Sequence, residues 1–237
     1  MKSKSELTTA DRAKIRDQAK HYKEISEYVG DWGIEIDKAK LVRDIHKNLM
    51  GVDNLGRLRP YEDLAFFLIT ARQYNLNPLK KEIYATYQKE QKGSQWVEKI
   101  TPIVSIHGLR KLARRSKNPT YAYTGKAEYA LKKDGEIDSA TVGVYGWFDN
   151  DGKVEVMKVG EYTAYFDEFV KTKTTKDGDI YRTGKWKNAP KMMLAKCAEA
   201  NAIRMAFDIS GIYIEEEIVD DENSVVSIAS DNVEDDK

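Results

Sequence analysis

Apolar residues recur at a helical spacing of three to four positions through the first part of the chain. This pattern predicts a charged helix over 6–29 and a second helix that Asp37 caps and that runs to about Met50. A third, strongly apolar helix follows Pro60, which suits the first turn of a helix because no N–H is needed there. The asparagines and the proline of 75–78 should end this third helix.

Beyond about residue 80 the apolar positions alternate with period two, which is typical of half-buried strands. The Asp-Gly pairs at 134–135 and 151–152 stand between such stretches and predict hairpin turns, because these residue types tolerate a positive φ. The predicted strands cover five stretches, namely 82–88, 96–105, 121–131, 139–148 and 154–161.

Helical spacing returns twice in this second part of the chain. We expect a helix over 107–117, after the first hairpin, and a long helix over 189–207 with a proline near its start. The segment 163–170 fits either a strand or a helix, and 171–187 is polar and rich in turn-forming residues.

The order of these elements lacks the regular strand–helix–strand alternation of parallel sheets. It predicts an α+β fold in which an antiparallel hairpin and a meander pack with helices. We expect one domain over 1–214, in which the helices of 1–50 are candidates for contacts between subunits. The segment 215–237 is expected to be an acidic, disordered tail.

Charge is distributed unevenly, although the whole chain carries 39 Lys and Arg against 39 Asp and Glu. The segment 215–237 holds ten acidic residues and one lysine, so residues 1–214 have a net charge of +9. A positive body suggests a polyanionic partner, and an acidic end suggests an interaction tail. Composition alone leaves a second interpretation open, in which both features only keep the protein soluble.

Cysteine content and hydropathy disfavour secreted and membrane proteins. A single cysteine rules out an intramolecular disulfide framework. No run of about 18 uncharged apolar residues occurs, and the first residues, MKSKSELTTADRAK, lack the apolar stretch of a secretory signal. We therefore expect a cytoplasmic protein without a membrane span.

Candidate catalytic and metal-binding motifs are weak. His21, His46 and His107 do not have metal-ligand spacing with Cys197, so we expect no metal site. The best match to a phosphate-binding loop has the wrong spacing and carries tryptophan where serine or threonine must bind magnesium. Asp151 fits a nuclease motif but also an ordinary turn, which we favour. The chain is predicted not to be an enzyme and to need no cofactor, with Mg²⁺ entering at most through bound DNA.

The segment 171–196 concentrates positive charge, with eight Lys or Arg and only two Asp. Cations neutralise phosphates and aromatic rings stack on unpaired bases, so this segment predicts a binding site for single-stranded nucleic acid. For Trp186 a second interpretation stays open, because tryptophan more often packs in a core. The candidate contacts are Lys171, Lys173, Lys176, Arg182, Lys185, Trp186, Lys191 and Lys196.

A second basic cluster lies in the predicted helix over 107–117, which contains no acidic residue. Arg110 and Arg114 fall on one stripe of this helix and are further candidate contacts. The alternative is an ordinary solvated helix face.

The last predicted helix extends the basic surface. Lys196 and Arg204 lie on either side of Ala200, whose small side chain lets a sugar–phosphate backbone approach closely. Lys191 lies in the first turn, where free backbone N–H groups favour a phosphate.

Several motifs, in order along the chain, resemble one protein family. Tyr74–Tyr84 (YNLNPLKKEIY) and Pro102–Gly108 (PIVSIHG) are similar to segments of the phage recombination protein Bet, or Red beta, family of RecT-type single-strand annealing proteins. The resemblance spans about 60–217. It continues through Trp186, Pro190-Lys191, Met193-Leu194, Lys196–Ala198, Arg204–Phe207, Gly211–Tyr213 and Glu216.

The resemblance implies a Red beta/Rad52-like annealing core that binds single-stranded DNA and anneals complementary strands without ATP. It implies phosphate contacts at Lys191 and Arg204. The lysines of the preceding loop fall in the region where family members contact DNA, but single lysines of that loop cannot be paired with single family positions. The sequence departs from the family pattern at Cys197, where some members have lysine, and at Asn75, which replaces a helix-ending glycine.

Family members assemble into rings or helical filaments and act beside a 5′–3′ exonuclease, and we expect this chain to lack the C-terminal partner-binding region of longer members. The sequence therefore predicts a phage- or prophage-encoded annealing protein of DNA recombination and repair. Its expected partners are single-stranded DNA, the annealed duplex, other copies of itself, the exonuclease and a host single-strand-binding protein. The alternative is a nucleic-acid-binding adaptor without annealing activity.

Overall fold

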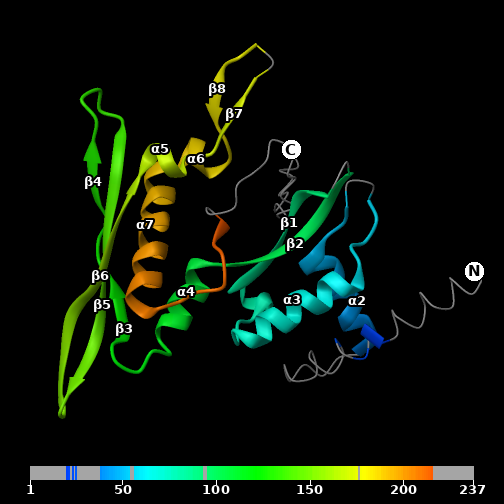
Figure 1. Cartoon of the computed structure of the whole chain (residues 1–237), viewed down its shortest axis with the longest axis horizontal. Helices are drawn as coiled ribbons and strands as arrows, with labels where there is room; N and C mark the ends of the chain where they lie inside the picture. Colours follow the sequence, from blue (N-terminus) through cyan, green and yellow to red (C-terminus); the bar gives the residue numbers. More distant parts are fainter. Residues whose placement is uncertain are drawn as a thin grey trace, which may run out of the picture. The chain divides into compact units, whose positions relative to one another are not determined.

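The computed structural model divides the chain into two compact units (Figure 1). One contains Met1–Pro78, Tyr84–Pro102 and Asn223–Lys237, and the other contains Leu79–Ile83 and Ile103–Glu222. The single domain over 1–214 that the sequence suggested stays a prediction. The described residues are 20, 21, 23, 25, 38–53, 56–92, 95–175 and 177–215.

Two predictions fall mostly outside the described residues. These are the charged helix over 6–29, of which four residues are described, and the acidic tail, of which only Glu215 is described. Among the described residues, no helix combines the length and the apolar character that crossing a membrane requires.

Two helices and a hairpin form the described part of the first unit. Helix α2 (Lys38–Met50) contacts α3 (Tyr61–Gln73), and β1 (Ile83–Lys92) pairs with β2 (Gln95–Val104). These elements confirm the predictions, except that Pro60 is the residue before the first turn of α3 rather than part of it. The buried side chains of the two helices are Val42, Ile45, His46, Met50, Leu64, Ala65, Phe67, Leu68 and Ala71.

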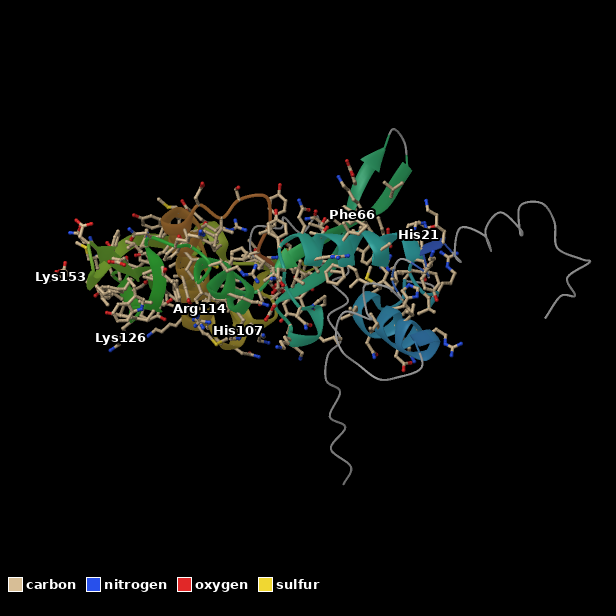
Figure 2. The ribbon with its side chains drawn as sticks, turned by 90° about the horizontal axis from the view of Figure 1, so that it is seen from below. His21, Phe66, His107, Arg114, Lys126 and Lys153 are labelled. Carbon is tan, nitrogen blue, oxygen red and sulfur yellow. The ribbon has the colours of Figure 1, made fainter. Side chains whose placement is uncertain are left out.

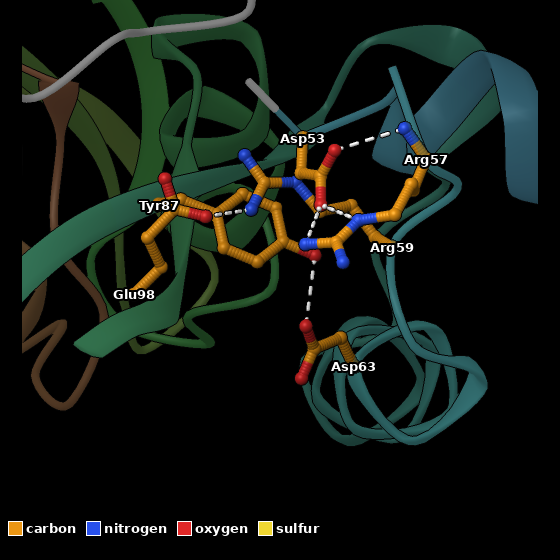
Figure 3. A network of polar contacts seen from close by, with 6 residues as sticks. All are labelled: Asp53, Arg57, Arg59, Asp63, Tyr87 and Glu98. Carbon is orange, nitrogen blue, oxygen red and sulfur yellow. Dashed lines mark hydrogen bonds and ion pairs between the residues drawn. The ribbon is translucent and has the colours of Figure 1, made fainter. Parts of the chain in front are cut away.

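A buried arginine links these elements (Figure 3). The side chain of Arg59 is only 5% exposed, forms an ion pair with Glu98 of β2, and lies 3.8 Å from the ring centre of Tyr87 of β1. The Tyr87 hydroxyl donates to Asp63 of α3 at 3.1 Å, and the His46 Nε2–H of α2 donates to the Arg59 carbonyl at 2.7 Å. Burial raises the pKa of Asp63 and lowers that of His46.

The second unit takes in the last two residues of a short 3₁₀ turn (Pro78–Lys80). The chain returns to this unit at Ile103, just before helix α4 (Ile106–Ala113). Ser105 caps α4, because its Oγ accepts a hydrogen bond from the Gly108 N–H at 3.1 Å. The predicted helix over 107–117 ends four residues early, since Pro119 disfavours helical backbone before it and cannot donate a helical hydrogen bond.

Strand β5 (Ile137–Asn150) is the centre of an antiparallel sheet. Strand β6 (Lys153–Tyr165) pairs along one edge of β5, while β3 (Thr120–Thr124) and β4 (Glu128–Leu131) follow one another along the other edge. The sequence predicted β3 and β4 as one strand over 121–131. The antiparallel sheets and the accompanying helices confirm the predicted α+β class.

The break between β3 and β4 lies at Gly125. Its N–H donates to the Gly143 carbonyl of β5 at 2.8 Å, so the chain stays at the sheet edge there. A Cβ at position 125 would lie 3.1 Å from the Tyr145 ring and 3.2 Å from the Gly143 oxygen. A side chain at position 125 would push these neighbours by a few tenths of an ångström, so glycine suits this close approach. The alternating pattern of polar and apolar residues does not reveal it.

Both predicted Asp-Gly turns are confirmed. Asp151 and Gly152 have φ values of 51° and 86°, which suits the two-residue turn that joins β5 to β6. Gly135, with φ of 85°, lies in the turn between β4 and β5.

Helix α7 (Pro190–Phe207) covers one face of this sheet and confirms the predicted last helix. It approaches β6 closely at Gly160, where a Cβ would lie 2.9 Å from the Ala206 Cβ and 3.2 Å from the Ala202 carbonyl oxygen. The core between helix and sheet contains Ile137, Ala140, Val142, Ala164, Phe166, Trp186, Met193, Leu194, Cys197 and Ala198.

The ambiguous segment 163–170 completes β6 and then forms the short helix α5 (Phe166–Phe169). The polar segment that follows contains a small hairpin of β7 (Thr172–Thr174) and β8 (Ile180–Arg182), and then the short helix α6 (Lys185–Asn188). Figure 1 shows this β7–β8 hairpin projecting beyond α5 and α6 as an arm.

Candidate nucleic-acid interface

The arm of β7 and β8 carries the middle of the predicted basic segment. Lys173 of β7 lies opposite Tyr181 of β8, and both side chains are exposed. Among the described residues, no acidic side chain pairs with Lys173. Lys176, another predicted contact, lies outside the described residues.

Arg182 forms contacts between the arm and the rest of the unit. Its guanidinium donates to the Glu136 carboxylate at 2.6 Å and lies 4.8 Å from the ring centre of Phe166. Both interactions are intramolecular, so a phosphate at Arg182 would have to compete with them.

Trp186 packs in the core, which was the second of the two interpretations that its sequence context allowed. It is 3% exposed, and its ring packs edge-on against Phe166 with the ring centres 5.9 Å apart. An indole buried in this way cannot stack on a base, so the predicted DNA contact at Trp186 is replaced by a role in the core.

Three exposed lysines surround the start of α7. Lys185 and Lys187 lie on α6, and no ion pair forms with either among the residues that the structure describes. The Lys191 ammonium lies 5.7 Å from the ring centre of Tyr129, whose hydroxyl donates to the Lys191 carbonyl at 3.1 Å. Ala189 gives α7 no side-chain cap, so its first-turn N–H groups and these lysines form one electropositive region.

Lys171 and Lys196 contact the same residue. The Lys171 ammonium donates to the Glu215 carbonyl at 3.2 Å, and that of Lys196 lies 3.8 Å from the Glu215 carboxylate. The start of the acidic segment therefore occupies two of the predicted DNA-contacting cations.

Arg204, near the end of α7, contacts the backbone beyond the helix. Its guanidinium donates to the Ile212 carbonyl, and its own carbonyl accepts from the Ile209 N–H at 3.2 Å. These bonds hold the segment after α7 in place. The phosphate contact predicted at Arg204 stays a prediction.

The second basic cluster is partly neutralised by distant acids. The Arg110 guanidinium donates to both oxygens of buried Glu199, at 2.6 and 2.8 Å, and the hydrogen bonds to Glu199 raise the pKa of Arg110. Lys111 pairs with Glu82 at 2.5 Å. Sequence spacing could not reveal these pairs, and we do not carry Arg110 into the proposed interface.

Arg114 stands after the last turn of α4, so the predicted helical stripe does not extend to it. Its guanidinium lies 5.5 Å from the ring centre of Tyr121, and the residue is exposed. Figure 2 places Lys153 at the far tip of the β5–β6 hairpin. Lys153 is an exposed comparison residue far from the lysines of α6 and α7, and it differs from them in forming an ion pair with Glu155.

The described residues contain no group of three or more histidine, cysteine, aspartate or glutamate side chains that could hold a metal ion. Cys197 is buried in the core, and Asp151 lies in its turn.

Lys187 is an exposed cation that the sequence analysis did not name as a candidate contact, although it belongs to the basic segment 171–196.

Comparison with known proteins identifies the family. A model of the RecT family matches residues 59–228, which is more than half of the chain. The chain belongs to the RecT family. All eleven predicted contacts lie within this RecT match.

Among curated proteins, recombination protein bet of Escherichia phage lambda is 32% identical to this RecT-family chain over 152 residues. The alignment covers 63% of the chain, which spans about half the length of that relative (49%). No solved structure matches the chain.

Proposed function

We propose that this RecT-family protein binds single-stranded DNA and anneals complementary strands in phage recombination, without ATP. The observation that carries the proposal is a group of exposed lysines on the arm, on α6 and in the first turn of α7. Among the described residues, none of these lysines has an acidic partner, whereas acids are abundant elsewhere in the chain. The lysines are Lys173, Lys185, Lys187 and Lys191.

The proposed mechanism requires no covalent chemistry, so the protein is proposed not to be an enzyme. Lysines hold one strand by its phosphates and screen its repulsion of a second strand. Base pairing then drives the reaction, at about 1.4 kcal/mol per stacked step. No nucleotide or metal takes part, except Mg²⁺ that accompanies the DNA.

We further propose that several copies bind one strand as a ring or helical filament, which multiplies weak contacts. A 5′–3′ exonuclease would supply the strand in the cytoplasm of the bacterial host, and a host single-strand-binding protein is the candidate further partner. These proposals rest on the relationship to the lambda protein and on the resemblance of the motifs.

The test is an annealing assay with two complementary fluorescent oligonucleotides, mixed in sequence without ATP. We expect the protein to accelerate annealing only when the strands are complementary. Binding without acceleration would favour an adaptor, and degraded strands would favour a nuclease; either result contradicts annealing. Asp151→Asn should leave the rate unchanged.

Salt dependence tests the contacts themselves. Four lysines that neutralise four phosphates predict that log affinity falls against log salt with a slope of about −3 per subunit. Lys187→Ala and Lys191→Ala should each lower affinity about fivefold at 0.1 M salt and make the slope shallower by about 0.7. The control Lys153→Ala removes an exposed lysine that lies far from α6 and pairs with Glu155, and it should change neither quantity.

A further inference from the structure

The two faces of the β7–β8 arm differ in their surroundings. Residues two apart on a strand share a face, so Ile180 and Arg182 lie on one face and Tyr181 lies on the other. Lys173 is the direct cross-strand partner of Tyr181 and shares its face. The arm therefore presents an aromatic ring and an ammonium group side by side.

The face of Arg182 is the one turned toward the rest of the unit. Arg182 reaches Glu136 and the Phe166 ring, and the Thr183 N–H and hydroxyl both donate to the Lys171 carbonyl, at 2.9 and 3.2 Å. These contacts fix the base of the arm. The pair of Lys173 and Tyr181 lies on the opposite face of the arm from the contacts of Arg182.

Both members of this pair are exposed. Tyr181 is 47% exposed, and Lys173 and its neighbours on β7 are all exposed. The core beside the arm already contains Trp186 and Phe166, so the unit does not use the Tyr181 ring for its own packing. A large aromatic ring on an exposed arm is available to a ligand.

We propose that Tyr181 stacks on an unpaired base of bound DNA while Lys173 contacts the phosphate beside that base. The inference rests on the proposed binding of single-stranded DNA and assigns a base-contacting residue to it. A ring stacks on any of the four bases, so the contact tolerates all sequences. Paired bases in a duplex are already stacked, so Tyr181 favours single strands over duplex.

The test compares two substitutions on neighbouring residues of the arm. Tyr181→Thr removes the ring, and Ile180→Thr removes an apolar side chain that is even more exposed, at 72%, from the opposite face. Threonine suits a strand in both places. Affinity is measured for a fluorescent oligothymidylate and for an oligonucleotide of equal length and charge whose central nucleotides lack bases.

We expect Tyr181→Thr to weaken binding of oligothymidylate by about 5- to 150-fold, the equivalent of ~1–3 kcal/mol for one stacked base. Binding of the abasic oligonucleotide should stay within about twofold of the unsubstituted protein, and Ile180→Thr should bind both normally. Tyr181→Phe should retain the affinity, since the ring remains. In 5-iodouracil oligonucleotides, photocrosslinking should occur at Tyr181.

Three results would overturn the inference. Unchanged binding by Tyr181→Thr excludes stacking there but leaves the proposed function in place. Equal weakening for both oligonucleotides shows a general effect on the arm rather than a base contact. If the unsubstituted protein binds neither oligonucleotide, the proposed function fails and the base contact fails with it.

Discussion

The ion pair between Arg59 and Glu98 provides a quantitative test of how the first unit is held together (Figure 3). The substitution Glu98→Gln keeps the shape of the side chain but removes the charge opposite a guanidinium that is 5% exposed. Arg59 would then keep the Tyr87 ring and the more distant Asp63 as its remaining favourable neighbours. A buried cation that loses its anion destabilises the folded state.

The magnitude follows from the exposure of the two partners. Removing one member of a fully buried pair costs about 3–5 kcal/mol, and exposed pairs contribute about 0–1 kcal/mol. Glu98 is 30% exposed, so water screens the pair partly and we expect a loss of about 2 kcal/mol. At roughly 2–4 °C per kcal/mol, the unfolding midpoint should fall by about 4–8 °C.

The assay is differential scanning calorimetry, which resolves separate transitions if the two units unfold separately. The matched control is Glu90→Gln on the same β1–β2 hairpin, which breaks an exposed ion pair with Lys99 at 3.4 Å. We expect the control to lower the midpoint by less than about 2 °C. Equal shifts for the two variants would refute the argument that burial of Arg59 makes its ion pair important.

Three further predictions concern stability. Burial lowers the pKa of His46, so below about pH 6.5 the unfolded chain binds more protons and the free energy of unfolding should fall as pH decreases. Urea unfolding of His46→Gln should show a weaker pH dependence than the unsubstituted protein. Parallel curves of stability against pH for the two proteins would contradict this role of His46. In Gly108→Ala, the new Cβ would lie 2.2 Å from the Glu82 carbonyl oxygen. Urea unfolding should therefore show that the free energy of unfolding falls by about 1–3 kcal/mol or more. A fall of less than about 0.5 kcal/mol would show that the backbone adjusts freely. Glu199→Gln leaves the Arg110 guanidinium without a full counter-charge and should cost about 1–3 kcal/mol by the same measurement, while an unchanged midpoint would assign Arg110 to solvent.

Elements with a strong local signal could be predicted from the sequence. The long helix α7 and both Asp-Gly turns follow from the spacing of apolar residues and from backbone preferences, which depend on near neighbours only. The charge of the segment 171–196 likewise indicated the arm and the start of α7 as the candidate interface.

Features that depend on distant residues could not be predicted. The break between β3 and β4 depends on Gly125 lying against Gly143 of a later strand. The partner of Arg110 is 89 positions away, so a helix that seemed free of acids is paired through the fold. The choice between core and surface for Trp186 depends on Phe166, which precedes it by 20 residues and meets it only in the folded protein.

Three of the four arginines predicted as DNA contacts are held by groups of the protein itself. Arg110, Arg182 and Arg204 each donate to such groups. By contrast, Lys173, Lys185 and Lys191 form no ion pair among the described residues, although Lys171 and Lys196 both contact Glu215, and this difference fits the proposed activity. The exposed cations without an acidic partner on the arm, α6 and the start of α7 are lysines, as far as the described residues extend. The planar fork of arginine suits fixed, bidentate contacts, whereas lysine is a mobile point charge. Before two strands pair in the correct register, each strand must shift along the protein. Mobile lysine charges permit this shift, whereas fixed bidentate contacts would oppose it.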